Sequence, residues 1–110
     1  MRIAIVNDQN IALESLKRAL KKAPAAEIAW TAYNGAEAVE KCAKDKPDLI
    51  LMNLIMPVMD GVEATCRIMR ESPCSILIVT STPDSHKDMV FEAMGCGALD
   101  VTATPVLDSS

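Results

Sequence analysis

Short apolar runs that alternate with helically spaced apolar stripes limit the fold of this chain more than any other feature. The run Ile76-Leu77-Ile78-Val79 is continuously apolar, which is typical of a strand covered on both faces in a parallel sheet. The expected strands are Arg2–Val6, Glu27–Ala32, Leu49–Met52, Ser75–Thr80 and residues 99–103. The helical stripes between them are Leu13, Leu16 and Leu20; Ala36, Val39 and Ala43; Val62, Cys66 and Met69; Val90 and Met94.

This alternation predicts an α/β fold in which right-handed crossovers connect parallel strands. For five strands, the natural arrangement is the flavodoxin-like doubly wound sheet with strand order 2-1-3-4-5. We expect one domain over residues 1–105, and a tail or the start of a linker to an effector domain over residues 106–110. That last segment is too short for a fifth helix, so we expect this helix to be absent. The sheet face left bare would favour self-association.

Composition excludes several classes of protein. The chain has 110 residues, half of them apolar, which suits a single folded core and not a disordered tail. Its net charge of −4 argues against nucleic acid or an anionic membrane as the main partner. No apolar run approaches the roughly 20 residues that span a bilayer, and the start of the chain is no signal peptide. We therefore expect a cytoplasmic protein.

The four cysteines give no framework for a zinc site or for disulfides. Cys42, Cys66, Cys74 and Cys96 lie far apart in the sequence and form no C-x-x-C pair. We therefore expect all four to be reduced thiols in the core.

Polar residues follow the expected strands at the points where a doubly wound sheet binds its ligands. In an open α/β sheet, ligands lie beyond the carboxyl ends of the strands, close to the topological switch point. The residues in these places are Asn7, Asp8, Asn53, Thr80, Ser81, Thr104 and Pro105. Each of them alone has a simpler explanation, because Asp and Asn favour turns. Their joint placement favours a binding site.

Enzymatic interpretations find less support. Asp84, Ser85 and His86 are triad residue types, but neighbours at one helix start cannot form a relay, so we expect no catalytic triad. Asp84 or Ser85 is better explained as a helix N-cap. A small flavoprotein is also disfavoured, because the segment 7–10 is acidic where a flavin phosphate needs hydrogen-bond donors.

The sequence resembles the receiver domain of two-component response regulators. Residues 48–61, DLILMNLIMPVMDG, are similar to the family's central segment D-L-I-L-x-D-x-x-M-P-x-M-D-G. Val79-Thr80-Ser81 is similar to the family's switch strand, and residues 95–100 are like its G-x-G-A turn. Residues 61–65, 97–101 and 104–107 look most like chemotaxis-type protein-glutamate methylesterases. The opening residues 5–8 fit the subgroup that serves surface-sensing chemosensory systems.

The resemblance implies a regulatory domain of a two-component phosphorelay, with no hydrolase activity of its own. In such proteins the receiver precedes a methylesterase domain that it inhibits until it is phosphorylated by a sensor histidine kinase. The implied cofactor is Mg²⁺, held directly by Asp8 and the backbone carbonyl of Ile55, through water by Asn7, and by the residue at position 53. Thr80 would bind a phosphoryl oxygen.

The departures from the family pattern fall on this same site. Asn53 stands at the phosphoacceptor position, where an amide is a poor nucleophile and lacks the charge that helps to hold Mg²⁺. Asn7 replaces an acid of many relatives, Thr104 a lysine that contacts the phosphoryl group, and Val101 an aromatic switch residue. We therefore expect weak Mg²⁺ binding and no phosphorylation at position 53.

Two explanations of Asn53 stay open. It is either an engineered substitution that locks the unphosphorylated state, which the intact neighbouring residues favour, or the mark of a natural pseudo-receiver. A pseudo-receiver would act as a phosphorylation-independent protein-interaction module.

Overall fold

A computed structural model describes residues 1–105 and shows the predicted alternation of strands and helices. The elements are β1 (Arg2–Val6), α1 (Asn10–Lys21), β2 (Glu27–Ala32), α2 (Gly35–Lys44), β3 (Leu49–Met52), α3 (Gly61–Glu71), β4 (Ser75–Thr80), the 3₁₀ helix η1 (Pro83–His86), α4 (Lys87–Gly95) and β5 (Asp100–Ala103). All neighbouring strands are parallel, in the order β2-β1-β3-β4-β5. The predicted fold class and strand order are confirmed.

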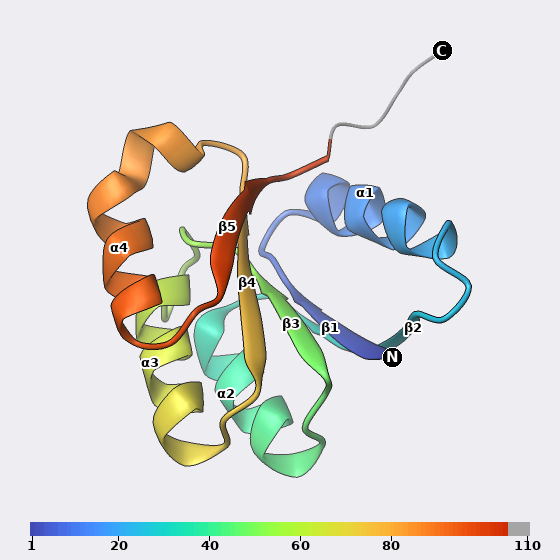
Figure 1. Ribbon diagram of the computed structural model, residues 1–110, viewed down its shortest axis with the longest axis horizontal. Helices are drawn as coiled ribbons and strands as arrows, with labels where there is room; N and C mark the ends of the chain where they lie inside the picture. Colours follow the sequence, from blue (N-terminus) through green and yellow to red (C-terminus); the bar gives the residue numbers. More distant parts are fainter. Residues whose placement is uncertain (106–110) are drawn as a thin grey trace.

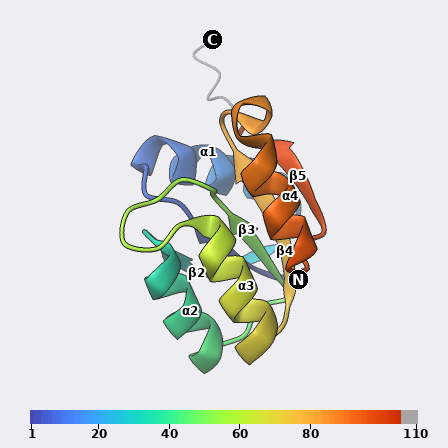
Figure 2. The same ribbon diagram turned by 90° about the vertical axis from the view of Figure 1, so that its left-hand side faces the viewer.

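The sheet separates two helical layers of unequal size. Helix α1 covers one face, and α2, α3 and α4 lie side by side on the other (Figures 1 and 2). Successive side chains of β1 alternate between these layers: Ile3 and Ile5 pack with α1, whereas Ala4 and Val6 pack with the three-helix layer. Because both faces are covered, the central strands are apolar throughout, as the sequence pattern predicts.

Side-chain hydrogen bonds cap the starts of α2 and α3, but not those of α1 and α4. The side chains of Asn34 and Asp60 accept the backbone N–H of the glutamate three residues later, each at 2.9 Å, and so cap α2 and α3. The predicted cap of the fourth helix at Asp84 or Ser85 is wrong. Pro83 instead begins the 3₁₀ turn η1, and α4 follows at Lys87 without a side-chain cap.

No helix follows β5 within residues 1–105. Residues 106–110, which we expected to be a tail or linker, lie outside the described residues, and self-association stays a prediction. None of the helices over residues 1–105 is both long and apolar enough to cross a membrane.

The expectation of four reduced cysteines is wrong for two of them. Cys66 on α3 and Cys96 at the end of α4 form a disulfide, because the two helices pack side by side and bring these Cα atoms to 5.0 Å. Closing a loop of about 30 residues stabilises a fold by about 3.5 kcal/mol. Cys42 and Cys74 are free thiols whose sulfurs lie 3.9 Å apart, and burial, with Cys42 nearby, raises the pKa of Cys74 to about 12.

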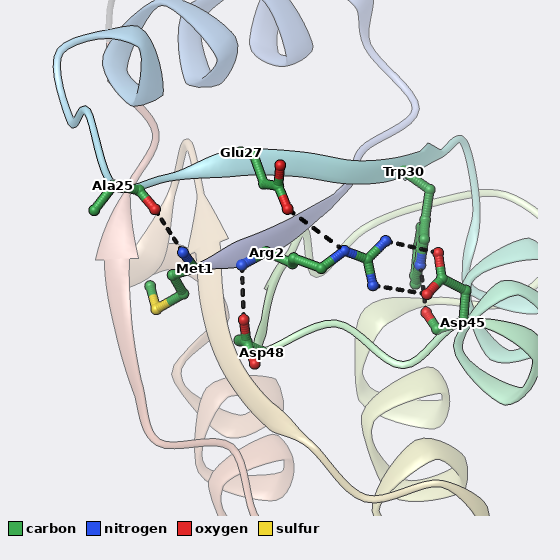
Figure 3. A network of polar contacts seen from close by, with 7 residues as sticks. All are labelled: Met1, Arg2, Ala25, Glu27, Trp30, Asp45 and Asp48. Carbon is green, nitrogen blue, oxygen red and sulfur yellow. Dashed lines mark hydrogen bonds and ion pairs between the residues drawn. The ribbon is translucent and has the colours of Figure 1, made fainter.

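A polar network fastens the edge strand β2 to the rest of the sheet (Figure 3). The Arg2 guanidinium donates to both carboxylate oxygens of Asp45, at 2.7 and 2.8 Å, and lies 3.8 Å from Glu27 on β2. The Arg2 backbone N–H donates to the carboxylate of Asp48 at 2.7 Å. The indole N–H of Trp30, also on β2, donates to the Asp45 carbonyl oxygen at 2.8 Å. The hydrogen bond from Arg2 holds the pKa of Asp45 below its usual value.

Close backbone approach requires glycine at the first position of α3. The Gly61 N–H donates to the Leu54 carbonyl at 2.7 Å, which folds the start of α3 back onto the end of β3. A Cβ at residue 61 would lie 2.0 Å from the carbonyl oxygen of Asn53. Between these points, the Met59 N–H donates to the Pro57 carbonyl across a γ-turn, with Val58 at φ 69°. The loop after β3 is therefore held tightly at both ends.

Replacing Asp45 with asparagine is expected to make the melting temperature fall less steeply as the pH is lowered. Because the folded pKa of Asp45 is lowered, its contribution is complete above about pH 4 and is lost as the pH falls through the folded value. Melting temperatures measured between about pH 2 and pH 6 test this. Glu40→Gln, which removes an exposed carboxylate from an ion pair on α2, is the control and should keep the wild-type slope. An unchanged slope in Asp45→Asn would contradict the prediction.

Gly61→Ala is expected to lower the free energy of unfolding by about 1–3 kcal/mol, because the added methyl group meets backbone atoms that cannot move aside independently. Gly95→Ala is the matched control: nothing lies within 4 Å of a Cβ there, so alanine in α4 should be neutral or stabilise by up to about 1 kcal/mol. Urea unfolding of both variants measures the difference, and equal stabilities would show that the loop relaxes freely.

Candidate functional site

The carboxyl ends of β1, β3, β4 and β5 surround a cavity of about 430 Å³. Six of the seven residues to which the sequence assigned a site role line it: Asn7, Asp8, Asn53, Ile55, Thr80 and Thr104. The seventh, Val101 on β5, is half-buried against the core of the three-helix layer and is not among the lining residues. The structure thus brings together the polar strand ends that the sequence singled out.

The Asn53 side chain joins two acceptors that face each other across the cavity. Its amide nitrogen donates to the Asp8 carboxylate at 3.3 Å and to the backbone carbonyl of Ile55 at 2.9 Å. The resemblance assigns these same two acceptors to Mg²⁺. The Asn53 amide nitrogen therefore already donates to both of these oxygens.

Asn7 plays a structural part at the floor of the site. It is only 2% exposed, and its side-chain oxygen accepts the backbone N–H of Gln9 at 2.9 Å, which shapes the turn from β1 into α1. Its oxygen is already engaged within the chain, so a contact to a metal-bound water would use its second lone pair.

Thr80 and Thr104 are held by the last contacts between β4 and β5. The Thr104 N–H donates to the Thr80 carbonyl at 3.0 Å, which extends the pairing of the two strands past the end of β5. Thr80 is 2% exposed, whereas Thr104 is half-buried at the rim. This hydrogen bond keeps both residues on the β4–β5 side of the cavity. Asp8 and Asn53 line the cavity from the ends of β1 and β3.

The site carries one negative charge. Asp8 is the only ionisable side chain among the lining residues that the structure describes, which include no lysine or arginine. Over residues 1–105, no group of three or more His, Cys, Asp or Glu side chains is arranged to hold a metal ion. The carboxylate of Asp8 and the backbone carbonyl of Ile55 are oxygen ligands of the kind that a hard cation prefers.

Sequence reasoning missed the contribution of α1 to the cavity wall. Ile11, Ala12 and Ser15 line it, together with Gln9, and the Ser15 hydroxyl donates to the Ile11 carbonyl at 2.9 Å. The missed signal was Ile11 itself. It lies off the Leu13–Leu16–Leu20 stripe, at the helix start that follows the polar end of β1.

Comparisons with known proteins agree with this geometry. The family model of the response regulator receiver domain matches residues 3–108. A protein-glutamate methylesterase/protein-glutamine glutaminase of Pseudomonas fluorescens Pf0-1 is 63% identical over 107 residues, which cover 97% of this chain and 32% of that protein. One from Pseudomonas aeruginosa is 61% identical with the same coverage. The chain thus spans about a third of the length of the curated relatives it matches.

Solved structures show the same relationship. The response regulator domain of Thermotoga maritima CheB superposes with a TM-score of 0.88 at 32% identity, over 96% of this chain and 78% of that one. The receiver domain of a NarL response regulator from Mycobacterium tuberculosis gives a TM-score of 0.83 at 25% identity, with coverages of 99% and 85%. The fold, the polar strand ends and the matched family model together show that this chain belongs to the response regulator receiver domain family.

Proposed function

We propose that this chain is the regulatory receiver of a chemotaxis-type methylesterase response regulator, held in its unphosphorylated state by Asn53. The observation that carries the proposal is the bridge from the Asn53 amide nitrogen to Asp8 and to the Ile55 carbonyl. A sensor histidine kinase and a methylesterase effector domain of the same protein are the proposed partners. The relatives' names and their greater length support this assignment.

The chemistry proposed for the site is phosphoryl transfer to the side chain at position 53. An aspartate there would attack the phosphoryl group and become an acyl phosphate, whereas the Asn53 amide is too weak a nucleophile. Thr80 would donate its hydroxyl to a phosphoryl oxygen, and Thr104 would take the place of the family's lysine at the rim. A bound Mg²⁺ would neutralise phosphoryl charge; Asp8 and the Ile55 carbonyl would hold it directly, and Asn7 through water.

A natural pseudo-receiver is the second candidate, and the same bridge favours it. Because the Asn53 amide satisfies both facing acceptors, the site needs neither a cation nor a phosphoryl group to be complete. Such a domain would bind its partner protein in one fixed state. In that role, Val101 on β5 would not act as a switch.

Asn53→Asp is expected to allow phosphorylation by acetyl phosphate, whereas the unaltered chain and Asn53→Ala stay unlabelled. The reason is that the substitution would supply the missing nucleophile in a cavity that Asp8 and Thr80 also line. Phosphate incorporation is measured by intact mass and by acid stability. Labelling of the unaltered chain would overturn the proposal, and a folded Asn53→Asp variant that stays unlabelled would favour the pseudo-receiver.

Mg²⁺ is expected to bind the unaltered chain only in the millimolar range or more weakly, since Asp8 supplies the one charge at the site. Asn53→Asp should tighten binding about tenfold or more, because it removes the bridging donors and sets two carboxylates side by side. Titration by chemical shift measures both affinities. Asp84→Asn, which removes an exposed acid outside the cavity, is the control. Equal affinities of the unaltered chain and the Asn53→Asp variant would place the metal elsewhere.

A further inference from the structure

The disulfide between α3 and α4 opens onto a groove that the proposed phosphorelay function does not use. The groove has a volume of about 740 Å³, and Cys66 is one of its lining residues. Val62 and Met89 provide apolar walls on either side. Cys66 as a residue is half-buried and lines the groove, whereas Cys42 is buried in the core. Figure 2 shows α3 and α4 running side by side along this surface.

The remaining lining residues give the groove an acidic end (Asp60, Glu63 and Glu92) and a basic end (Arg67 and Arg70). Glu63 lies one helical turn before Cys66 on α3, and Glu92 lies one turn before Cys96 on α4, so both carboxylates fall on the same side of the disulfide. Asp60, at the start of α3, lies on that side too and also caps the helix. No ion pair within residues 1–105 uses any of these five side chains. Their charges are therefore available to a ligand.

The distance between the acidic and basic ends of the groove matches the length of a small peptide. Glu63 and Arg70 are seven residues apart on α3, which corresponds to about 10 Å along the helix axis. An extended tripeptide spans about the same length. A peptide with an ammonium group at one end, a carboxylate at the other and a thiol between them would place its sulfur at Cys66.

We propose that the α3–α4 groove is a thiol–disulfide exchange site for a zwitterionic peptide thiol of the glutathione class. The peptide's ammonium group lies toward Glu63 and Glu92, and its terminal carboxylate lies toward Arg67 and Arg70. The thiol then approaches Cys66, the half of the disulfide that lines the groove.

The exchange proceeds in two successive thiol–disulfide reactions. The peptide thiolate attacks Cys66 Sγ, a new sulfur–sulfur bond forms, and the Cys66–Cys96 bond breaks with its electron pair on Cys96 Sγ. Cys96, at the C-terminal end of α4, leaves as a thiolate, which then takes up a proton from water. A second peptide thiolate then displaces Cys66 as a thiolate and leaves as the oxidised peptide dimer. The protein disulfide is thereby reduced while two peptide thiols are oxidised.

Cleavage of the disulfide acts directly on the attachment of α4. Only Val90 and Ala93 of this helix are buried, whereas α3 buries five residues along its length. The covalent link at its C-terminal end adds to this small buried contact. Exchange at Cys66 therefore makes the covalent link between α3 and α4 reversible.

The experiment uses the air-oxidised chain and compares four thiols: glutathione, mercaptoethanesulfonate, mercaptoethanol and cysteamine. Rates of disulfide cleavage are divided by the thiolate concentration of each reagent, because thiolates are the reactive species. Glutathione is expected to react fastest and to give an intermediate with one glutathione on Cys66, identified by peptide mass mapping. Arg67→Gln and Arg70→Gln should each lower the glutathione rate about 2–5-fold at low salt and leave the mercaptoethanol rate unchanged.

Arg18→Gln on the opposite face is the matched control and should leave all four rates unchanged. Glu63→Gln should lower the rates with glutathione and cysteamine but not with mercaptoethanesulfonate. Four free thiols in the oxidised chain, equal normalised rates for the four reagents, or a mixed disulfide confined to Cys96 would each overturn the proposal. Circular dichroism of every variant shows that the fold is retained, so that a change in rate reports on the groove.

Discussion

The parallel pairing of β1 with β3 is the contact on which the rest of the structure depends. Val6 lies opposite Met52 in this register, and the Asn53 N–H continues the ladder by donating to the Val6 carbonyl at 3.0 Å. The next residues of the two strands are Asn7 and Asn53, and Asp8, one residue further along the chain, accepts a hydrogen bond from the Asn53 amide at 3.3 Å. The same pairing divides the apolar side chains between the two helical layers. One register thus fixes both the core and the polar site.

At that edge, the Asn53 amide donates hydrogen bonds to the two acceptors that the family resemblance assigns to Mg²⁺. A carboxylate at position 53 would face Asp8 as a like charge, which needs a cation or a proton between the two groups. The Asn53 amide removes that repulsion and adds two donated hydrogen bonds. With an amide at position 53, Asp8 is the only negative charge among the described residues that line the site.

Most of the fold follows from the sequence, because the signals involved are local. Four of the five strands have the predicted bounds, and the fifth begins one residue later, after the Leu99 N–H has donated to the Ile76 carbonyl. The polar strand ends were predictable too, since a parallel sheet brings its carboxyl ends to one edge. The Cys66–Cys96 bond was not, because it depends on how two helices pack and not on spacing along the chain. The direction of the Asn53 amide likewise depends on acceptors contributed by two loops.

The disulfide also changes the connectivity of the chain. With Cys66 joined to Cys96, the end of α3, β4, η1 and α4 become a covalent ring, and Thr80 of the candidate site lies inside it. The segment of this ring around η1 is largely exposed and would be the natural place for a protease to cut. A single cut there would leave one covalently continuous molecule, with β4 still seated between β3 and β5. In its oxidised form, the domain can therefore lose the continuity of its backbone beside the site without losing a fragment.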